Sequence, residues 1–235
     1  MKNNRGLTLI RLIIIIVSIF AIVIVGKLLL KNSKNSKGSV EFSDGTTLIW
    51  KELKNVNNAK KYGYNENSIG DTDIGEKAFI YCENLTSITI PRDITSIGSF
   101  AFKDCQELRS VKIPNSVSYI GYSAFSGCTN LTSIKIPDSI DTINHSAFDN
   151  TGLKNVEIPN SVVCIEDSAF FNCEDLECIS IPKSVTKIGE GAFGYCENLK
   201  CVIYNGKEYT SISEFKSAFN KQIDEGAFYH TNLSE

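Results

Sequence analysis

The chain has 235 residues, of which 24 are basic and 27 acidic, and its formal net charge is -3 at pH 7. Residues 1–37 hold seven of the basic residues and no acidic one, which leaves 17 basic against 27 acidic residues in the remainder. A large acidic domain argues against nucleic acid as a partner, because phosphate binding needs a basic face.

Residues 1–6 are a short basic leader, and residues 7–30 are an apolar stretch whose only charge before Lys27 is Arg11. As a helix, the segment from Leu7 to Gly26 would span roughly 30 Å, the thickness of a bilayer core. It is longer than the apolar region of a cleaved secretory signal and has no A-x-A site. The sequence therefore predicts a single-pass membrane helix with the acidic part exported.

The leader resembles the prepilin-type signal of type IV pilins and pseudopilins in its basic hexamer ending at Gly6, in Leu7-Thr8-Leu9-Ile10 and in the apolar helix. The resemblance implies cleavage between Gly6 and Leu7 by a prepilin peptidase, methylation of Leu7 and contact with pilin-like subunits. Arg11 stands where the family usually has glutamate, and a cation there would repel the amine of a neighbouring subunit. Assembly into a filament is therefore less favoured than processing, and an uncleaved signal anchor is the alternative.

Residues 31–40 are polar and of low complexity, which predicts a flexible tether. We expect residues 41–73 to form an N-terminal cap. Within it, Phe42 to Trp50 should form a hairpin with Asp44-Gly45 at the turn, and Trp50 should cover the first repeat.

Residues 74–203 contain six copies of an Ala-Phe pair, with steps of 23, 23, 23, 22 and 23 residues between the alanines. A constant period of this length predicts a repeat solenoid. Apolar and polar residues alternate in each copy, which predicts a strand, and the five prolines of the chain follow these strands and end them. A second short strand and a single helical turn at the Ala-Phe pair should follow. The copy after Ala147 is one residue shorter and lacks the cysteine of the others.

The consensus L-x-S-I-x-I-P, followed by I-G-x-x-A-F and a cysteine, resembles the BspA-like leucine-rich repeat family. The resemblance implies a curved solenoid with a parallel β-sheet over residues 74–203. It also implies a surface or secreted protein that adheres to host or neighbouring-cell components. Residues 204–235 should form a C-terminal cap with a hairpin at Asn205-Gly206 and a short helix. The cap ends with an incomplete copy of the repeat motif from Ile223 to Phe228, here called the partial box, which does not keep the period of the repeats.

Eight cysteines raise the question of metal or disulfide bonds. Five share one repeat position and are expected to be small buried fillers: Cys82, Cys105, Cys128, Cys173 and Cys196. With no C-x-x-C pair and two histidines, we expect neither a metal site nor a cofactor. Cys178 and Cys201 take an outward position on adjacent rungs, about 4.8 Å apart and within disulfide range. Parallel strands are an awkward geometry for that bond, so two free thiols are the alternative.

We expect no catalytic residues, because no nucleophile motif or phosphate-binding loop is present and His145 and His230 are far apart in sequence. The predicted ligand-binding face consists of outward strand positions: Ser87, Thr89, Arg109, Ser110, Lys112, Ser133, Lys135, Asn155, Glu157, Glu177 and Ser180. Its basic residues lie in the early rungs and its glutamates in the later ones. A solvated surface of mixed charge is the alternative interpretation.

The sequence thus favours a bacterial, membrane-anchored surface protein whose solenoid lies outside the cell and binds a protein or glycan. One alternative is a minor pilin-like subunit that displays the repeats on a type IV pilus or secretion apparatus. Another is a spacer without a specific ligand.

Overall fold

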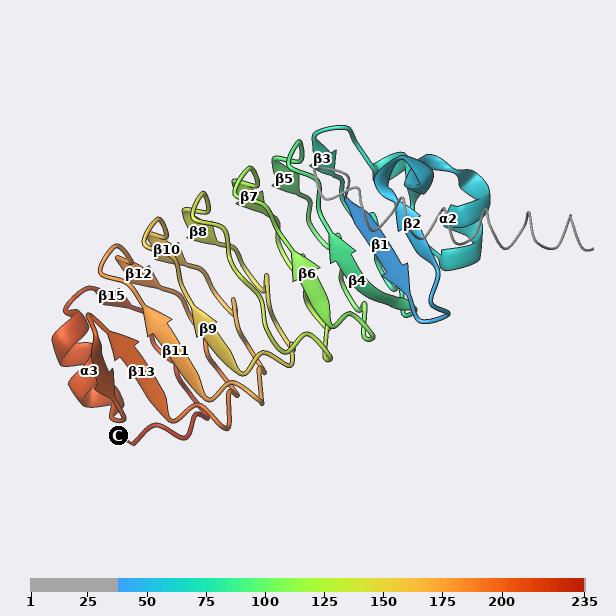
Figure 1. Ribbon diagram of the computed structural model, residues 1–235. Coiled ribbons are helices and arrows are strands. Elements are labelled where there is room, and N and C mark those ends of the chain that lie inside the picture. The colour runs from blue at the N-terminus through green and yellow to red at the C-terminus, as the bar shows by residue number, and fades with distance from the viewer. Residues whose placement is uncertain (1–37, 235) are drawn as a thin grey trace, which may run out of the picture. The chain divides into compact units, whose positions relative to one another are not determined.

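The computed structural model describes residues 38–234, in which each repeat forms one rung of a solenoid (Figure 1). The predicted leader, the predicted membrane helix at residues 7–30 and most of the predicted tether lie outside the described residues. Within residues 38–234, no helix is both long and apolar enough to cross a bilayer.

The first ladder contains the strands that precede the Pro or Asn turns. They are β4 (Leu85–Thr89), β6 (Ser110–Lys112), β9 (Asn155–Glu157), β11 (Cys178–Ile181) and β13 (Cys201–Tyr204). Pairing is parallel between β4 and β6 and from β9 through β11 to β13. Alternate residues point to opposite faces of a strand, so Ile88 and Val111 are buried while their polar neighbours face outward.

The second ladder contains two-residue strands that precede the Ala-Phe turns. They are β3 (Asp73–Ile74), β5 (Ser96–Ile97), β7 (Tyr119–Ile120), β8 (Thr142–Ile143), β10 (Cys164–Ile165), β12 (Lys187–Ile188) and β15 (Gln222–Ile223). A Cβ atom on Gly121, which follows β7, would lie only 2.5 Å from the backbone nitrogen of Ser99 in the preceding rung. Glycine at this position therefore allows the close approach of successive turns.

Both ladders are interrupted at the rung that starts at Leu131. Residues 131–136 form no strand, and no pairing joins β7 to β8. Asn144 replaces the glycine of this rung, and its buried side-chain amide donates a 2.6 Å hydrogen bond to the carbonyl of Ile120. The Ala-Phe turns stay linked here, since the N–H of Phe125 donates to the carbonyl of Ala147 at 2.9 Å. The rungs therefore remain stacked where the sheets are broken.

A column of stacked phenylalanine rings runs through the core. Successive rings lie 5.1–5.6 Å apart and within 13° of parallel. The column consists of Phe79, Phe102, Phe125, Phe148, Phe170 and Phe193, all fully buried. Because each ring fills the space between two rungs, the column joins every repeat to its neighbours.

The repeat cysteines are buried beside this column. Each thiol donates to a backbone carbonyl of the preceding rung, as Cys105 does to Phe79 at 2.9 Å and Cys128 to Phe102 at 3.1 Å. In the shortened copy, Thr151 takes the cysteine position and donates to the carbonyl of Phe148 at 3.0 Å. Thr151 thus fills the same buried position but bonds within its own turn, whereas the cysteines bond to the preceding rung.

The N-terminal cap contains β1 (Ser39–Phe42), β2 (Thr47–Ile49), η1 (Trp50–Lys54), α2 (Val56–Tyr62) and η2 (Glu66–Ser68). Strand β1 pairs antiparallel with both β2 and β4, and Gly45 adopts a φ of 78° in the turn of the hairpin. The ring that covers the first repeat phenylalanine belongs to Tyr64, which lies 5.4 Å from Phe79 and is tilted by 38°. Trp50, which we expected there, is partly buried against the core.

The C-terminal cap contains β14 (Lys207–Tyr209), which is antiparallel to β13, and α3 (Ile212–Phe219). Helix α3 buries Phe215 and Phe219. The partial box then rejoins the solenoid: β15 pairs with β12, and Phe228 stacks on Phe193 at 4.9 Å. The box is out of register in sequence but supplies one more rung in space.

Candidate ligand-binding face

The outward residues of the first ladder form two rows, here called the strand face. Ser87 is paired with Ser110 and Thr89 with Lys112. Three rungs further on, Glu157 is paired with Ser180. By repeat position, Lys112, Lys135 and Glu157 follow one another in the same row.

The strand face is hollowed over its later rungs. A groove of about 770 Å³, the strand-face groove, is lined by four residues that we predicted for ligand binding: Lys135, Asn155, Glu157 and Ser180. Ile134, Val156 and Ile203 add apolar surface. A smaller hollow of about 410 Å³ shares Glu157 and Ser180 with the groove and extends to Lys183. The arrangement offers both charged and apolar contacts to one ligand.

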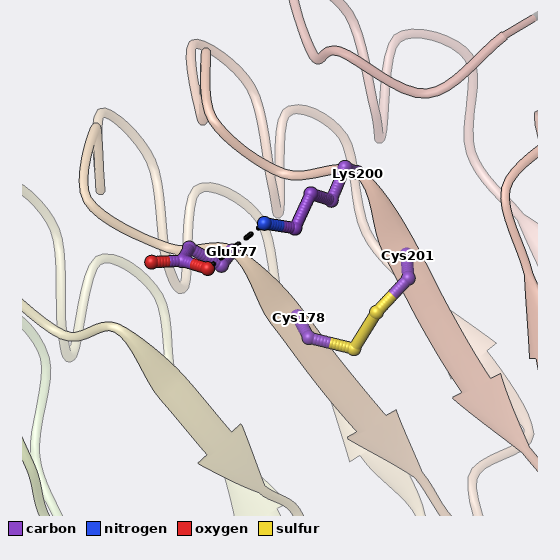
Figure 2. Close-up of a disulfide and its surroundings, with 4 residues drawn as sticks. All are labelled: Glu177, Cys178, Lys200 and Cys201. Carbon is purple, nitrogen blue, oxygen red and sulfur yellow. Dashed lines mark hydrogen bonds and ion pairs between the residues drawn. A yellow bond between two sulfur atoms is a disulfide. The ribbon is translucent and has the colours of Figure 1, made fainter.

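Two of the predicted charged residues are neutralised by neighbours. Arg109 forms an ion pair with Glu107 at 2.9 Å. Glu177 forms one with Lys200 at 2.9 Å (Figure 2), and the hydrogen bond from this lysine lowers the pKa of the Glu177 carboxyl. The simple division into basic early rungs and acidic later rungs therefore needs correction, because Lys200 balances Glu177.

Three predicted charges remain without such partners. Within residues 38–234, no ion pair involves Lys112, Lys135 or Glu157, and all three side chains are exposed. Lys135 and Glu157 both line the strand-face groove, while Lys112 lies one rung before Lys135. The unpaired charges are thus two cations followed by one anion along a single row.

The other predicted residues do not line the groove. Ser87, Thr89 and Ser110 lie on β4 and β6, and Ser133 lies in the segment without a strand. Ser87 donates a hydrogen bond to a carboxylate oxygen of Glu41 at 3.2 Å, so the N-terminal cap already occupies its hydroxyl. The groove therefore begins later along the solenoid than the sequence indicated.

Cys178 and Cys201 form a disulfide bond at the C-terminal end of the strand face (Figure 2). They face each other directly in the pairing of β11 with β13, with 4.9 Å between their α-carbons. Cys178 also lines the strand-face groove. The bond therefore ties the two rungs together at one wall of the groove.

Sequence reasoning missed Asp138 and Ile203 as groove residues. Asp138 follows the proline that ends its strand segment, a position that reads as a connection between elements. Ile203 occupies an outward position in a row whose other members are polar. An apolar residue at an outward position was the available signal for Ile203.

Outside the strand face, the structure brings His145 and His230 to the Ala-Phe turns. His145 is exposed, and His230 stacks on Tyr195 at 4.6 Å. In the part of the chain that the structure describes, no group of His, Cys, Asp or Glu is arranged to hold a metal ion.

The repeats match the family model for the BspA type leucine rich repeat region, with six copies over residues 72–200. The chain belongs to the BspA type leucine-rich repeat family. The resemblance noted over residues 74–203 is thereby confirmed. Leucine-rich repeat solenoids of this kind are typically binding scaffolds.

Solved leucine-rich repeat structures support the fold. A protein from Bacteroides ovatus ATCC 8483 is 40% identical with a TM-score of 0.54, over 56% of this chain and 34% of that chain. This BspA type chain thus spans about a third of that relative's length. A protein from Eubacterium ventriosum ATCC 27560 is 23% identical over 86% of this chain and 63% of that one, with a TM-score of 0.54.

The leucine-rich repeat protein of T. pallidum is 22% identical over 67% of this chain and 79% of that one, with a TM-score of 0.55. At this identity, the T. pallidum and Eubacterium structures show the fold alone. No curated protein matches the chain.

Proposed function

We propose that this BspA type protein is a bacterial cell-surface protein that binds an extracellular protein or glycan through its strand face. The observation that carries the proposal is the strand-face groove, in which Lys135 and Glu157 form no ion pair within residues 38–234. A volume of about 770 Å³ falls within the range of roughly 300–1,000 Å³ typical of ligand sites.

The charges of this face favour a partner with complementary charges. Lys112 and Lys135 would contact acidic groups, and Glu157 would contact a basic or hydroxyl group. Charged residues at such a rim act mainly on the rate of association and on specificity, and salt weakens their effect. Ile134 and Ile203, which line the groove and are partly exposed, would supply apolar contact area that salt does not screen.

The apolar segment at residues 7–30 supports membrane anchoring in this proposal, because its length and composition suit a single span. Residues 31–40 would then tether the solenoid outside the membrane. Both flanks of the apolar segment are basic, so the placement of the solenoid outside the cell rests on the shortness of the N-terminal side, which is expected to stay in the cytoplasm.

The test uses the full-length protein in detergent on arrays of glycans and bacterial and host surface proteins. We expect binding by the unaltered protein, and loss of most of that binding in the double variant Lys112→Glu, Lys135→Glu. The matched control reverses two exposed lysines in the caps, Lys60→Glu and Lys216→Glu. Equal binding and equal salt dependence in both double variants would contradict a role for the strand face.

The leader supports a second candidate, a minor pilin-like subunit, through the basic hexamer that ends at Gly6. Mass spectrometry of the native N-terminus in membrane and pilus fractions separates the two candidates. An N-methylated Leu7 favours the pilin-like route, and an intact Met1 excludes it.

A further inference from the structure

We propose a second interaction surface, at the Ala-Phe turns near the C-terminal end, which docks an arginine side chain of a partner protein. The surface is a hollow of about 440 Å³, here called the ridge hollow. It is lined by the three carboxylates of Asp167, Glu190 and Glu225, by the ring of Tyr229, by His145, and by one serine and two glycines. None of these residues belongs to the strand face, so the inference does not depend on the proposed function.

The three carboxylates take the same repeat position, two residues after the isoleucine of the second ladder. The pairing of β10 with β12 and of β12 with β15 is parallel and in register, so these side chains follow one another on successive rungs. Rungs are about 4.8 Å apart, and like charges on neighbouring strands destabilise a sheet. Asp167 Oδ1 accepts a hydrogen bond from the backbone N–H of Glu190 at 3.0 Å, so the repulsion falls mainly on Glu190 and Glu225.

Residues 38–234 supply no lysine or arginine partner for these carboxylates, and the basic side chain that lines the hollow is His145. Within residues 38–234, no ion pair involves Asp167, Glu190 or Glu225. The nearby Lys187 pairs with Asp224 at 3.7 Å instead. All three carboxylates are exposed, so a cation from outside can reach them.

An aromatic wall stands beside the carboxylates. Tyr229 is 36% exposed and Tyr195 37%, and their rings meet edge to face at 5.0 Å. The ring of Tyr229 packs directly against the backbone of Gly194. A side chain at this position would clash, since a Cβ atom would lie 2.6 Å from the ring. Exposed aromatic faces attract cations, most strongly when carboxylates lie close by.

The chemistry of the ridge hollow favours arginine over other cations. The hollow combines carboxylates with an exposed tyrosine ring, which suits a flat organic cation. A guanidinium group is planar and weakly hydrated, so it can stack on a tyrosine ring while it donates hydrogen bonds to carboxylates. An ammonium group is a compact, strongly hydrated charge and gains less from the ring.

The test measures binding of a short peptide of alternating arginine and glycine to the immobilised full-length protein. The control peptide has citrulline in place of arginine, which keeps the shape and removes the charge. We expect the double variant Glu190→Gln, Glu225→Gln to weaken arginine-peptide binding about tenfold at low salt. Tyr229→Leu should weaken it about threefold through loss of the cation–π contact.

The matched control is the double variant Glu83→Gln, Glu208→Gln, which removes the same charge from exposed glutamates outside both the ridge hollow and the strand-face groove. Its affinity should stay within about twofold of the unaltered protein, as expected for remote surface charges. Equal weakening by the two double variants would show attraction to net charge alone and overturn the proposal. So would full affinity of the citrulline peptide, or of the arginine peptide for Tyr229→Leu.

Discussion

The repeat cysteines show how one residue position serves the architecture. Their thiols are buried and hydrogen-bonded to the preceding rung. Burial disfavours the charged thiolate and raises the pKa of Cys82 to about 12, and it also raises those of Cys105 and Cys128. Cys164 differs because it is only half-buried, on the second ladder.

Alkylation at mildly alkaline pH tests this distinction. In the folded protein, we expect one label, at Cys164, because the other five free thiols are buried and inaccessible to the reagent. Unfolding without reductant should give six labels, and unfolding with reductant all eight. Intact-mass measurement counts the labels. Eight labels without reductant would contradict the disulfide between Cys178 and Cys201.

The same pKa shifts predict lower stability at alkaline pH. In the unfolded chain, the thiols ionise around their ordinary value of 9.0, whereas in the folded protein Cys82 stays neutral up to about 12. The unfolded state therefore binds fewer protons above pH 9, and the free energy of unfolding falls as pH rises. Denaturant titrations across this range should show the fall, and replacing Cys82, Cys105 and Cys128 with alanine should reduce it.

At the scale of elements, the phenylalanine column joins the rungs. Phe125 is fully buried and stacks on Phe102 at 5.1 Å and on Phe148 at 5.6 Å. Phe228 extends the column by one ring: it stacks on Phe193 at 4.9 Å, and Phe215 of α3 meets it edge to face at 5.6 Å. An interior ring thus supports two interfaces between rungs, and the last ring supports one.

Truncation of these rings should have unequal effects. Phe125→Ala should lower the free energy of unfolding by about 3–5 kcal/mol, because it leaves a cavity between two rungs. Phe228→Ala should lower the free energy of unfolding by less, and it should loosen mainly the partial box. Denaturant unfolding gives the totals, and hydrogen exchange locates the loosened residues. Equal costs, or loosening spread evenly over all rungs, would contradict the column as the joining element.

The period of the sequence predicts most of these elements, because each repeat needs the same apolar positions to stack on the next. The period cannot predict β15, since Ala227 lies 35 residues after Ala192 and only the folded chain returns it to the ladder. It also cannot predict the break at Asn144, where a side-chain amide bonds to the carbonyl of Ile120. Both features depend on contacts between rungs.

The candidate site was less predictable than the fold for the same reason. Outward positions follow from alternation, and four of the predicted residues do line the strand-face groove. Which charges remain unpaired depends on neighbours one rung away, as with Glu177 and Lys200. The ridge hollow escaped sequence reasoning because Tyr229 reaches the acidic column only after the last box rejoins the solenoid.

At the scale of the whole molecule, the stacked rungs separate the residue positions that build the core from those that a partner can contact. Inward positions hold the phenylalanines and cysteines, and the turns and outward strand positions carry the variable charges. The strand face and the ridge hollow lie in different parts of each repeat, so one solenoid could engage two partners. The caps close both ends of the stack, with α2 near one end and α3 near the other (Figure 1).

Hydrogen exchange of the full-length protein, with and without the partner found on the arrays, tests the central claim most directly. The account predicts slower amide exchange on binding in β6, in residues 133–135 and in β9, with little change in α2 and α3. Protection confined to the caps or to the Ala-Phe turns would contradict binding through the strand face.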